Sequence, residues 1–160
     1  MTDPASATSV ITQIDRYGRV LYTRAQLEAF FDRIDFRRSA ASVDFNLSLD
    51  ILTILQRHFL AAIPFESLSL HYSPHHIVSV DPQAVFRKIV GEVNLEDGNV
   101  KLNAKKGEGR GGYCMENSLL FGTVLRSLGF EVYPTGARVN EAVQPIAASK
   151  GWIGPKFDGW

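Results

Sequence analysis

The sequence predicts an α+β fold in which helices come first and are followed by a long loop, one more helix and a strand. Apolar residues recur at helical spacing in three segments before residue 91 and again after residue 114. Between them, residues 91–112 are rich in Gly, Asn and Lys, which is typical of a loop. With 160 residues, 45% of them apolar, the chain can form one domain with a buried core.

Charge and cysteine content narrow the class of protein. Seventeen basic and seventeen acidic side chains cancel, so no strong field favours nucleic acid or an anionic membrane surface. No apolar run approaches the roughly 18 residues that a membrane span needs. Met1 to Ser9 do not resemble a secretory signal, and the single cysteine excludes an internal disulfide. We therefore expect a cytoplasmic protein in a reducing setting.

Residues 1–20 contain Pro4, several Ser and Thr, and Gly18, and we expect them to form a flexible N-terminal arm. An amphipathic helix follows, because Thr23 can cap it and apolar residues repeat at helical spacing. Its apolar positions are Leu27, Phe30, Phe31 and Ile34. The positions expected to face solvent are Glu28, Asp32 and Arg33.

Two further helices are expected before residue 91. Ser48 can cap the first, whose apolar pattern is interrupted at Pro64. Asp81 can cap the second, with Pro82 in its first turn. The apolar faces comprise Leu49, Leu52, Leu55, Phe59 and Leu60 in one helix and Val85, Phe86, Ile89 and Val90 in the other.

The segment between these two helices is irregular. The alternation of Leu68 and Leu70 predicts a short strand, and a turn around Pro74 is expected nearby. The segment contains three histidines, His71, His75 and His76. They indicate either a metal site or a surface turn. We favour the turn, because no second cysteine or clear carboxylate lies at ligand spacing.

Cys114 lies where the Gly-rich loop gives way to the next helix. That helix is predicted from apolar residues that repeat as far as Leu128, and it should end at Gly129. From Phe130 to Val139 we expect a strand at a sheet edge or with a bulge, since the segment contains a proline and a glycine.

Cys114 is a candidate nucleophile. The unpaired N–H groups and the dipole of a helix N-terminus favour a thiolate over a neutral thiol. Gly111 and Gly112 allow close approach of the backbone, and Arg110 adds positive charge. Against this, a lone cysteine is often a small core residue, and no histidine follows Cys114 to act as its base. From the residues alone, both interpretations stay open.

Two other motifs have alternative interpretations. Residues 107–112 match the dinucleotide-binding pattern G-x-G-x-x-G, but that motif needs a buried strand directly before the first glycine. The four preceding residues are Asn, Ala, Lys and Lys, which argues against it. Glu66 is either a buried carboxylate that anchors a neighbouring loop or a solvated turn residue.

Three segments together resemble the arylamine N-acetyltransferases. Residues 110–117, with the sequence RGGYCMEN, closely match that family's signature around its nucleophilic cysteine. Residues 63–71 resemble a second family segment, and the stretch from Tyr22 to Phe36 resembles its usual opening. The resemblance extends to Trp160 and is closest to fungal members.

The resemblance implies a fold similar to that of cysteine proteases, with a helical bundle, a β-barrel and a C-terminal lid. Residues 21–129 would form the bundle, including the active-site loop and the cysteine-bearing helix, and residues 130–160 would begin an incomplete barrel domain. The family's catalytic His and Asp lie beyond the position that corresponds to Trp160. The resemblance therefore implies a chain truncated before both.

Carried over by position, Cys114 would be the catalytic residue that accepts the acyl group. The other site residues implied are Arg110 and Glu66 in the polar scaffold, Gly111 and Gly112 in the loop, and Tyr113 and Phe65 lining the cleft. No metal is implied.

The implied reaction is ping-pong transfer of an acetyl group from acetyl-CoA, or of another acyl group, to an arylamine or hydrazine, as in xenobiotic detoxification. The acyl-CoA is a substrate, and no permanently bound cofactor, nucleic acid or membrane partner is implied. Activity of these 160 residues is left open, because the catalytic His and Asp would be missing. The alternative is a non-catalytic binding or regulatory fragment that self-associates through the edge of the unfinished barrel.

Overall fold

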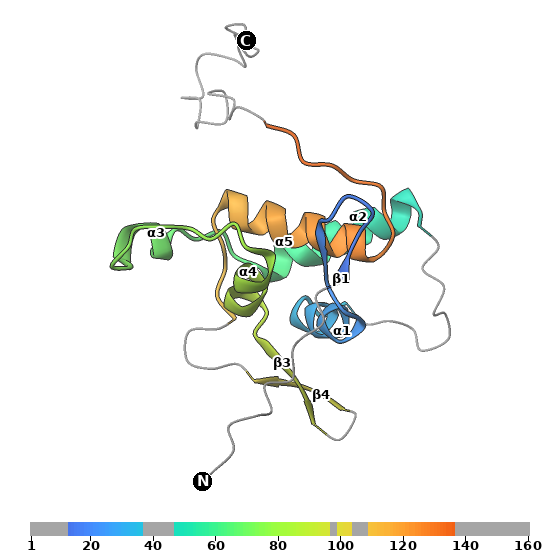
Figure 1. Ribbon diagram of the computed structural model, residues 1–160, viewed down its shortest axis with the longest axis horizontal. Helices are drawn as coiled ribbons and strands as arrows, with labels where there is room; N and C mark the ends of the chain where they lie inside the picture. The colour runs from blue at the N-terminus through green and yellow to red at the C-terminus, as the bar shows by residue number, and fades with distance from the viewer. Residues whose placement is uncertain (1–12, 37–46, 97–98, 104–108, 137–160) are drawn as a thin grey trace, which may run out of the picture.

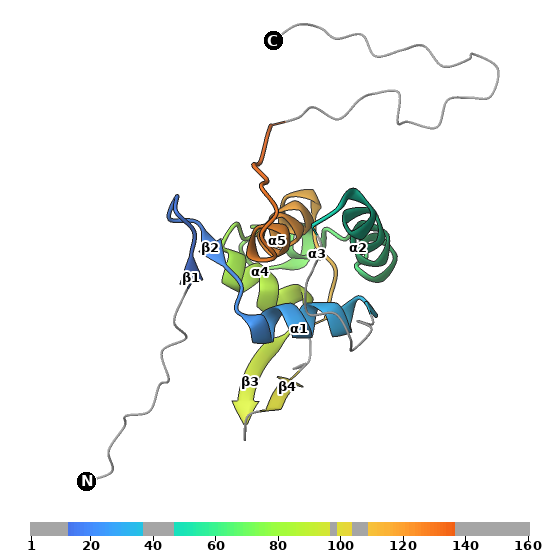
Figure 2. The same ribbon diagram turned by 90° about the vertical axis from the view of Figure 1, so that its right-hand side faces the viewer.

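The computed structural model describes residues 13–36, 47–96, 99–103 and 109–136. The elements in chain order are β1 (Gln13–Ile14), β2 (Val20–Leu21), α1 (Arg24–Arg33), α2 (Leu49–Ala62), α3 (Leu68–Tyr72), α4 (Pro82–Ile89), β3 (Glu92–Glu96), β4 (Asn99–Asn103) and α5 (Cys114–Ser127). Four helices, α1, α2, α4 and α5, gather around the core, and the β3–β4 hairpin projects past α1 (Figures 1 and 2). This mixture of helix and sheet confirms the α+β class.

Three helices begin at the predicted caps. The Thr23 side chain accepts a hydrogen bond from the Gln26 N–H at 3.3 Å, and the Gln26 side chain accepts one from the Thr23 N–H at 3.0 Å. Asp81 accepts from the Ala84 N–H at 2.9 Å, and Ser48 caps α2 in the same way. Each cap satisfies a backbone donor that the first helical turn leaves unpaired.

The core lies where the apolar faces of these helices meet. The Phe59 ring of α2 lies 4.8 Å from Phe121 of α5 and 6.1 Å from Phe30 of α1, measured between ring centroids. Tyr22, just before α1, packs against Phe86 of α4 at 4.9 Å. Other fully buried side chains are Ile34, Leu55, Val85, Ile89, Leu120 and Val124.

Two residues of the predicted apolar face of α2 do not reach the core. Leu49 is 76% exposed and Leu60 is 67% exposed, whereas Leu55 is fully buried. At 100° per residue, both positions lie about 120–140° around the helix from Leu55. The buried stripe of α2 is therefore narrower than its apolar composition indicates.

The segment expected to be a flexible arm is in part a hairpin. β1 and β2 pair antiparallel, with Gln13 opposite Leu21. The Asp15 side chain accepts hydrogen bonds from two backbone N–H groups within the turn, which Gly18 completes at a φ of 74°. The Arg19 side chain also donates to the Val132 carbonyl at 3.3 Å. The part of the predicted arm formed by residues 1–12 lies outside the described residues.

The predicted strand at Leu68 and Leu70 is wrong, because these residues belong to helix α3. The N–H groups of Leu70 and His71 both donate to the Ser67 carbonyl, at 3.0 and 3.1 Å. The Leu68 N–H donates to the carboxylate of Glu66. These local hydrogen bonds turn the backbone into a short helix despite the alternating pattern. The three histidines of this segment are exposed, as expected for a surface turn.

The predicted long loop at residues 91–112 contains a β-hairpin. β3 and β4 pair antiparallel, from Glu92 opposite Asn103 to Glu96 opposite Asn99. Both strands contact α1. After α5 a strand was expected from Phe130, but residues 130–136 form no strand. The rest of that segment, and with it most of the expected barrel region, lies outside the described residues.

α5 begins at Cys114 and ends where predicted. Its last turn leads into Gly129, whose φ of 98° suits glycine and stops the helix. In the described part of the chain, no helix combines the length and apolar character needed to cross a bilayer.

Candidate active site

Two segments far apart in the sequence meet beside the start of α5. The Gly112 N–H donates to the Pro64 carbonyl at 3.2 Å, and the Glu66 N–H donates to the Gly112 carbonyl at 3.0 Å. These bonds form an isolated parallel bridge between Phe65 and Gly112. The segment after α2 and the loop before Cys114 thus hold each other in register. We call this pair of segments, residues 63–66 and 110–113, the loop clamp.

The close approach of the two segments in the loop clamp requires Gly111, and Gly112 is closely packed against side chains of α4 and α5. A Cβ atom on Gly111 would lie 1.9 Å from the carbonyl oxygen of Pro64. On Gly112 it would lie 2.5 Å from Oδ1 of Asn117 and 2.9 Å from Cδ1 of Ile89. Real Cβ atoms essentially never lie this close to another atom. A larger residue at position 111 must therefore push the two segments apart, whereas at position 112 the side chains of Asn117 and Ile89 must move.

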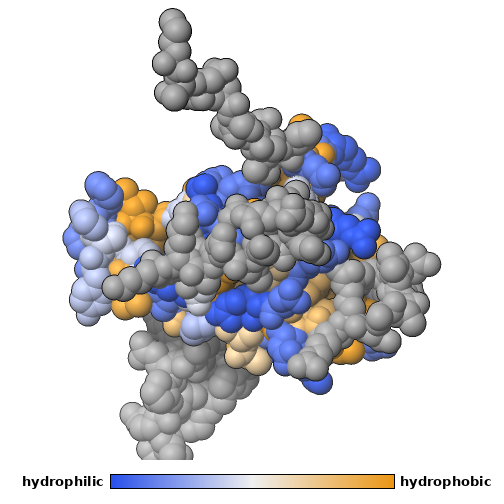
Figure 3. Space-filling view, turned by 90° about the horizontal axis from the view of Figure 1, so that it is seen from below, coloured by the Kyte–Doolittle hydropathy of each residue, from blue (hydrophilic) through white to orange (hydrophobic). Residues whose placement is uncertain are grey.

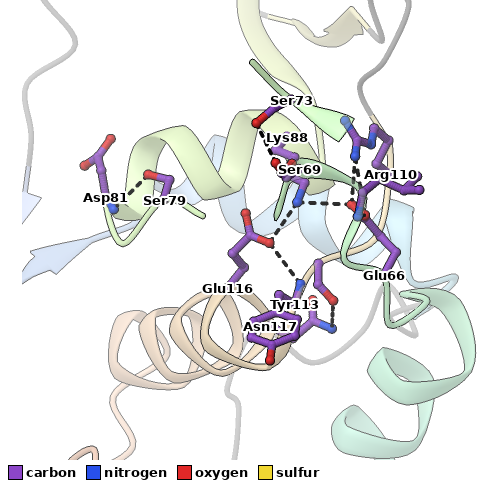
Figure 4. Close-up of polar contacts among 12 residues, drawn as sticks. Glu66, Ser69, Ser73, Ser79, Asp81, Lys88, Arg110, Tyr113, Glu116 and Asn117 are labelled. Carbon is purple, nitrogen blue, oxygen red and sulfur yellow. Dashed lines mark hydrogen bonds and ion pairs between the residues drawn. The ribbon is translucent and has the colours of Figure 1, made fainter. Parts of the chain in front are cut away.

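Four charged side chains form a cluster beneath the loop clamp (Figure 4). Lys88 of α4 lies between two carboxylates, with its Nζ 3.1 Å from Oε1 of Glu66 and 2.8 Å from Oε2 of Glu116. Arg110 donates to both oxygens of Glu66 at 3.1 and 3.3 Å. Two positive and two negative groups therefore balance. We refer to these four residues as the charged cluster.

The structure decides between the two interpretations of Glu66. Its side chain is only 13% exposed, and it joins α4, the loop before α5 and the N-terminus of α3. Burial raises the pKa of the Glu66 carboxyl, but the Leu68 N–H and the cations Lys88 and Arg110 outweigh burial and hold that pKa below its usual value. Glu66 is an anchoring carboxylate and not a solvated turn residue.

This lowered pKa gives a prediction for the acid stability of the fold. A carboxyl whose pKa is lower in the folded than in the unfolded chain stabilises the fold above its unfolded pKa, and this stabilisation is lost as pH falls through the folded pKa. Glu66→Gln should therefore be less stable than wild type near neutral pH, and the difference should shrink below about pH 4.5. Denaturant unfolding at a series of pH values measures it. A difference that is constant from neutral to acid pH would contradict the assignment.

Cys114 is the first residue of α5, and it is exposed. The interpretation of Cys114 as a small core residue is therefore wrong. Two side chains of the first helical turn fix the backbone beside it. Oε2 of Glu116 accepts from the Tyr113 N–H at 2.9 Å, and the Asn117 amide donates to the Gly112 carbonyl at 2.9 Å. These contacts join the helix N-terminus to the loop clamp.

Exposed apolar groups lie next to Cys114 in the sequence and on the neighbouring segment of the loop clamp. The Phe65 and Tyr113 rings are in contact, with their centroids 5.5 Å apart, and Phe65 is 65% exposed. Met115, on the other side of Cys114 in the sequence, is 52% exposed. Figure 3 shows further apolar surface on the side of the molecule that carries α3. Leu68, the first residue of α3, is 49% exposed. An apolar or aromatic substrate can contact such groups.

The other two kinds of site considered from the sequence, a metal site and a dinucleotide site, gain no support from the described residues. In the described ranges, no group of three His, Cys, Asp or Glu side chains is placed to bind a metal ion. The strands before Gly109 form an antiparallel hairpin, whereas the dinucleotide motif requires a strand that runs directly into its first glycine. Residues 104–108, which include the first two positions of that motif, lie outside the described residues.

The partners of two cations, Lys88 and Arg33, could not be recognised from the sequence. Lys88 was not singled out, because it follows Arg87 at the end of α4 and resembles an ordinary basic helix terminus. Arg33 was expected in solvent, but it donates to three carbonyl groups, at 3.3 Å to Ile89, 3.1 Å to Ala62 and 3.0 Å to Gly109. It thus ties α1 to the ends of α2 and α4 and to the loop before Arg110.

Comparison with known proteins identifies the class. Residues 48–151, more than half of the chain, match the family model described as N-acetyltransferase. The chain belongs to the arylamine N-acetyltransferase family, as the signature at residues 110–117 predicted. The family that this model describes is one of acyltransferases.

Individual relatives come from fungi and from vertebrates. The N-malonyltransferase FDB2 of Gibberella moniliformis is 33% identical over 172 residues, which cover 100% of this chain and 44% of that protein. The Fusarium pseudograminearum protein of the same name is 33% identical, over 95% of this chain and 43% of its own length. The pineal gland isozyme NAT-10 of Gallus gallus, an arylamine N-acetyltransferase, is 34% identical over 71% of this chain and 31% of its own length. The chain thus spans less than half the length of these relatives.

Proposed function

We propose that this chain carries the acyl-accepting half of an N-acyltransferase, with Cys114 as the nucleophile. The observation that carries the proposal is the exposed thiol at the first position of α5, directly after the loop clamp. The N–H groups in the first turn of a helix have no partner within the helix, and the helix dipole favours a negative charge there. The thiolate is the form of a cysteine that attacks a carbonyl.

The chemistry is a two-step transfer. The Cys114 sulfur attacks the thioester carbonyl of an acyl-CoA, a new carbon–sulfur bond forms, and coenzyme A leaves as its thiolate. An amine nitrogen then attacks the carbonyl carbon of the Cys114 thioester, and a carbon–nitrogen bond forms. The carbon–sulfur bond breaks and returns the Cys114 thiolate, while the nitrogen gives up one proton to solvent and keeps the acyl group. In this proposal, N–H groups at the start of α5 stabilise the oxyanion of each tetrahedral intermediate.

The donor and the acceptor are part of the proposal. We propose acetyl-CoA as donor and an arylamine or hydrazine as acceptor, with malonyl-CoA as the competing donor, because the fungal relatives are named N-malonyltransferases. The acyl-CoA acts as a substrate, and no permanently bound cofactor or metal is required. We place the reaction in the cytoplasm, where a reducing setting keeps the lone thiol free.

Labelling of the chain by radioactive acyl-CoA tests the proposal. After incubation with labelled acetyl-CoA or malonyl-CoA and denaturation, the protein should retain label that neutral hydroxylamine releases, as expected for a thioester. Cys114→Ser should retain none. No histidine follows Cys114 in the sequence, so we expect the labelling to be slow and to accelerate as pH rises and the thiolate fraction grows. Equal labelling of wild type and Cys114→Ser would refute the proposal.

The second candidate is a non-catalytic module that self-associates. The exposed apolar residues on the side of α3 favour it, since large exposed apolar patches mark interaction surfaces. Such a module would show no hydroxylamine-sensitive label, and its molecular mass in sedimentation equilibrium would rise with protein concentration. Labelled protein that stays monomeric would exclude it.

A further inference from the structure

Lys88 is the link between the two carboxylates of the charged cluster. Glu116 is 1% exposed, and among the described residues Lys88 is the cation that pairs with it. Glu66, in contrast, keeps Arg110 as a second partner. Lys88 itself is only 16% exposed, so water screens its charge weakly. Without Lys88, the charge on Glu116 would be buried and unbalanced.

Glu116 connects Lys88 with the backbone next to the thiol. The Oε2 atom that pairs with Lys88 at 2.8 Å also accepts the Tyr113 N–H at 2.9 Å. Tyr113 immediately precedes Cys114, so one oxygen atom connects the ammonium group of α4 with the backbone at the start of α5. In Figure 4, Lys88 lies between Glu116 on one side and Glu66 on the other.

We propose that Lys88 is a positioning residue for Cys114. It neutralises Glu116 in the first turn of α5 and holds that turn against Glu66 of the loop clamp. The inference rests on the proposed function, because it concerns the reactivity of the proposed nucleophile. The charged groups that face Lys88 are Glu66, Arg110 and Glu116, from three different segments.

Alkylation of the lone cysteine tests this role. Cys114 is the single cysteine of the chain, so the rate of iodoacetamide consumption reports on it alone. Lys88→Met should react about threefold more slowly at neutral pH, because an unbalanced carboxylate close to the thiol disfavours the thiolate. Its pH–rate profile should shift to higher pH, an effect that a merely structural role would not produce. Circular dichroism checks that the variant is folded.

Matched variants separate the role of Lys88 from general effects of charge. Arg87→Met removes one positive charge from the neighbouring, exposed position of α4 and should leave the rate and the profile unchanged. Lys88→Arg keeps the cation and should restore most of the rate. Lys88→Met combined with Glu116→Gln removes both charges and should also approach the wild-type rate, since the Gln oxygen can still accept the Tyr113 N–H.

The outcomes are decisive in each case. A folded Lys88→Met variant with the wild-type rate and profile would overturn the proposal. If Lys88→Met does not fold, the double variant decides. A double variant that reacts at nearly the wild-type rate supports the role of Lys88. A double variant that is unfolded or reacts slowly overturns that role. Alkylation needs no acyl-CoA, so the two proposals can fail separately. If acyl labelling fails while the alkylation rate still depends on Lys88, only the proposed function is rejected.

Discussion

Replacement of Gly111 by alanine is expected to destabilise the fold by about 3 kcal/mol or more, because one methyl group cannot fit into the loop clamp. The added Cβ would lie 1.9 Å from the carbonyl oxygen and 2.8 Å from the carbonyl carbon of Pro64. Both are backbone atoms, so no change of rotamer relieves the clash. The two segments must separate, which breaks the hydrogen bonds that join Gly112 to Pro64 and Glu66.

Denaturant unfolding of Gly111→Ala measures this effect, with Gly122→Ala as the matched control. Gly122 lies within α5, and its Cβ would meet only Nη1 of Arg126 at 3.6 Å, which is an ordinary contact. Alanine is favoured over glycine inside a helix by about 1 kcal/mol, so the control should be neutral or more stable than wild type. Similar stabilities for the two variants would show that the loop clamp is looser than described.

Arg33→Met is expected to destabilise the fold by about 2–3 kcal/mol. The guanidinium group donates to carbonyls at the ends of α2 and α4 and to the Gly109 carbonyl before the loop clamp. Hydrogen bonds to a charged group are stronger than those between neutral groups, and the variant leaves three carbonyls without this donor. Because Arg33 is half-buried, water will replace part of the lost hydrogen bonding.

Arg24→Met is the control for Arg33→Met, since both residues lie on α1. Arg24 is 78% exposed and forms only a surface ion pair with Glu28 at 3.0 Å. Such pairs contribute little, so this variant should change the free energy of unfolding by less than about 0.5 kcal/mol. Thermal or denaturant unfolding compares the two. A loss of equal size at both positions would contradict the bridging role of Arg33.

The features that could be predicted from the sequence are those with local causes. Thr23, Ser48 and Asp81 cap helices through hydrogen bonds to residues a few positions further along the chain. The helix that starts at Cys114 and stops at Gly129 follows from spacing and from the left-handed conformation that glycine favours. Local patterns also predicted a reactive position for Cys114, and the structure places its side chain at the surface.

The features that could not be predicted depend on where other elements lie. Arg33 and Lys88 sit at ordinary helical positions, and only the packing of four separate segments gives them their partners. The arm and the long loop were read from composition, which does not reveal antiparallel partners such as Gln13 and Leu21. The strand predicted at Leu68 is wrong for a local reason, because the Leu68 N–H donates to the Glu66 carboxylate and the next turn donates to the Ser67 carbonyl.

The central claim is that Cys114 accepts an acyl group at the start of α5. Mass spectrometry that maps the modified residue after exposure to acetyl-CoA or malonyl-CoA tests it most directly. We expect one acyl group, carried by the peptide that contains Cys114 and removed by neutral hydroxylamine. Acyl groups found only on lysine side chains, or a Cys114 peptide that stays unmodified at every pH, would contradict it.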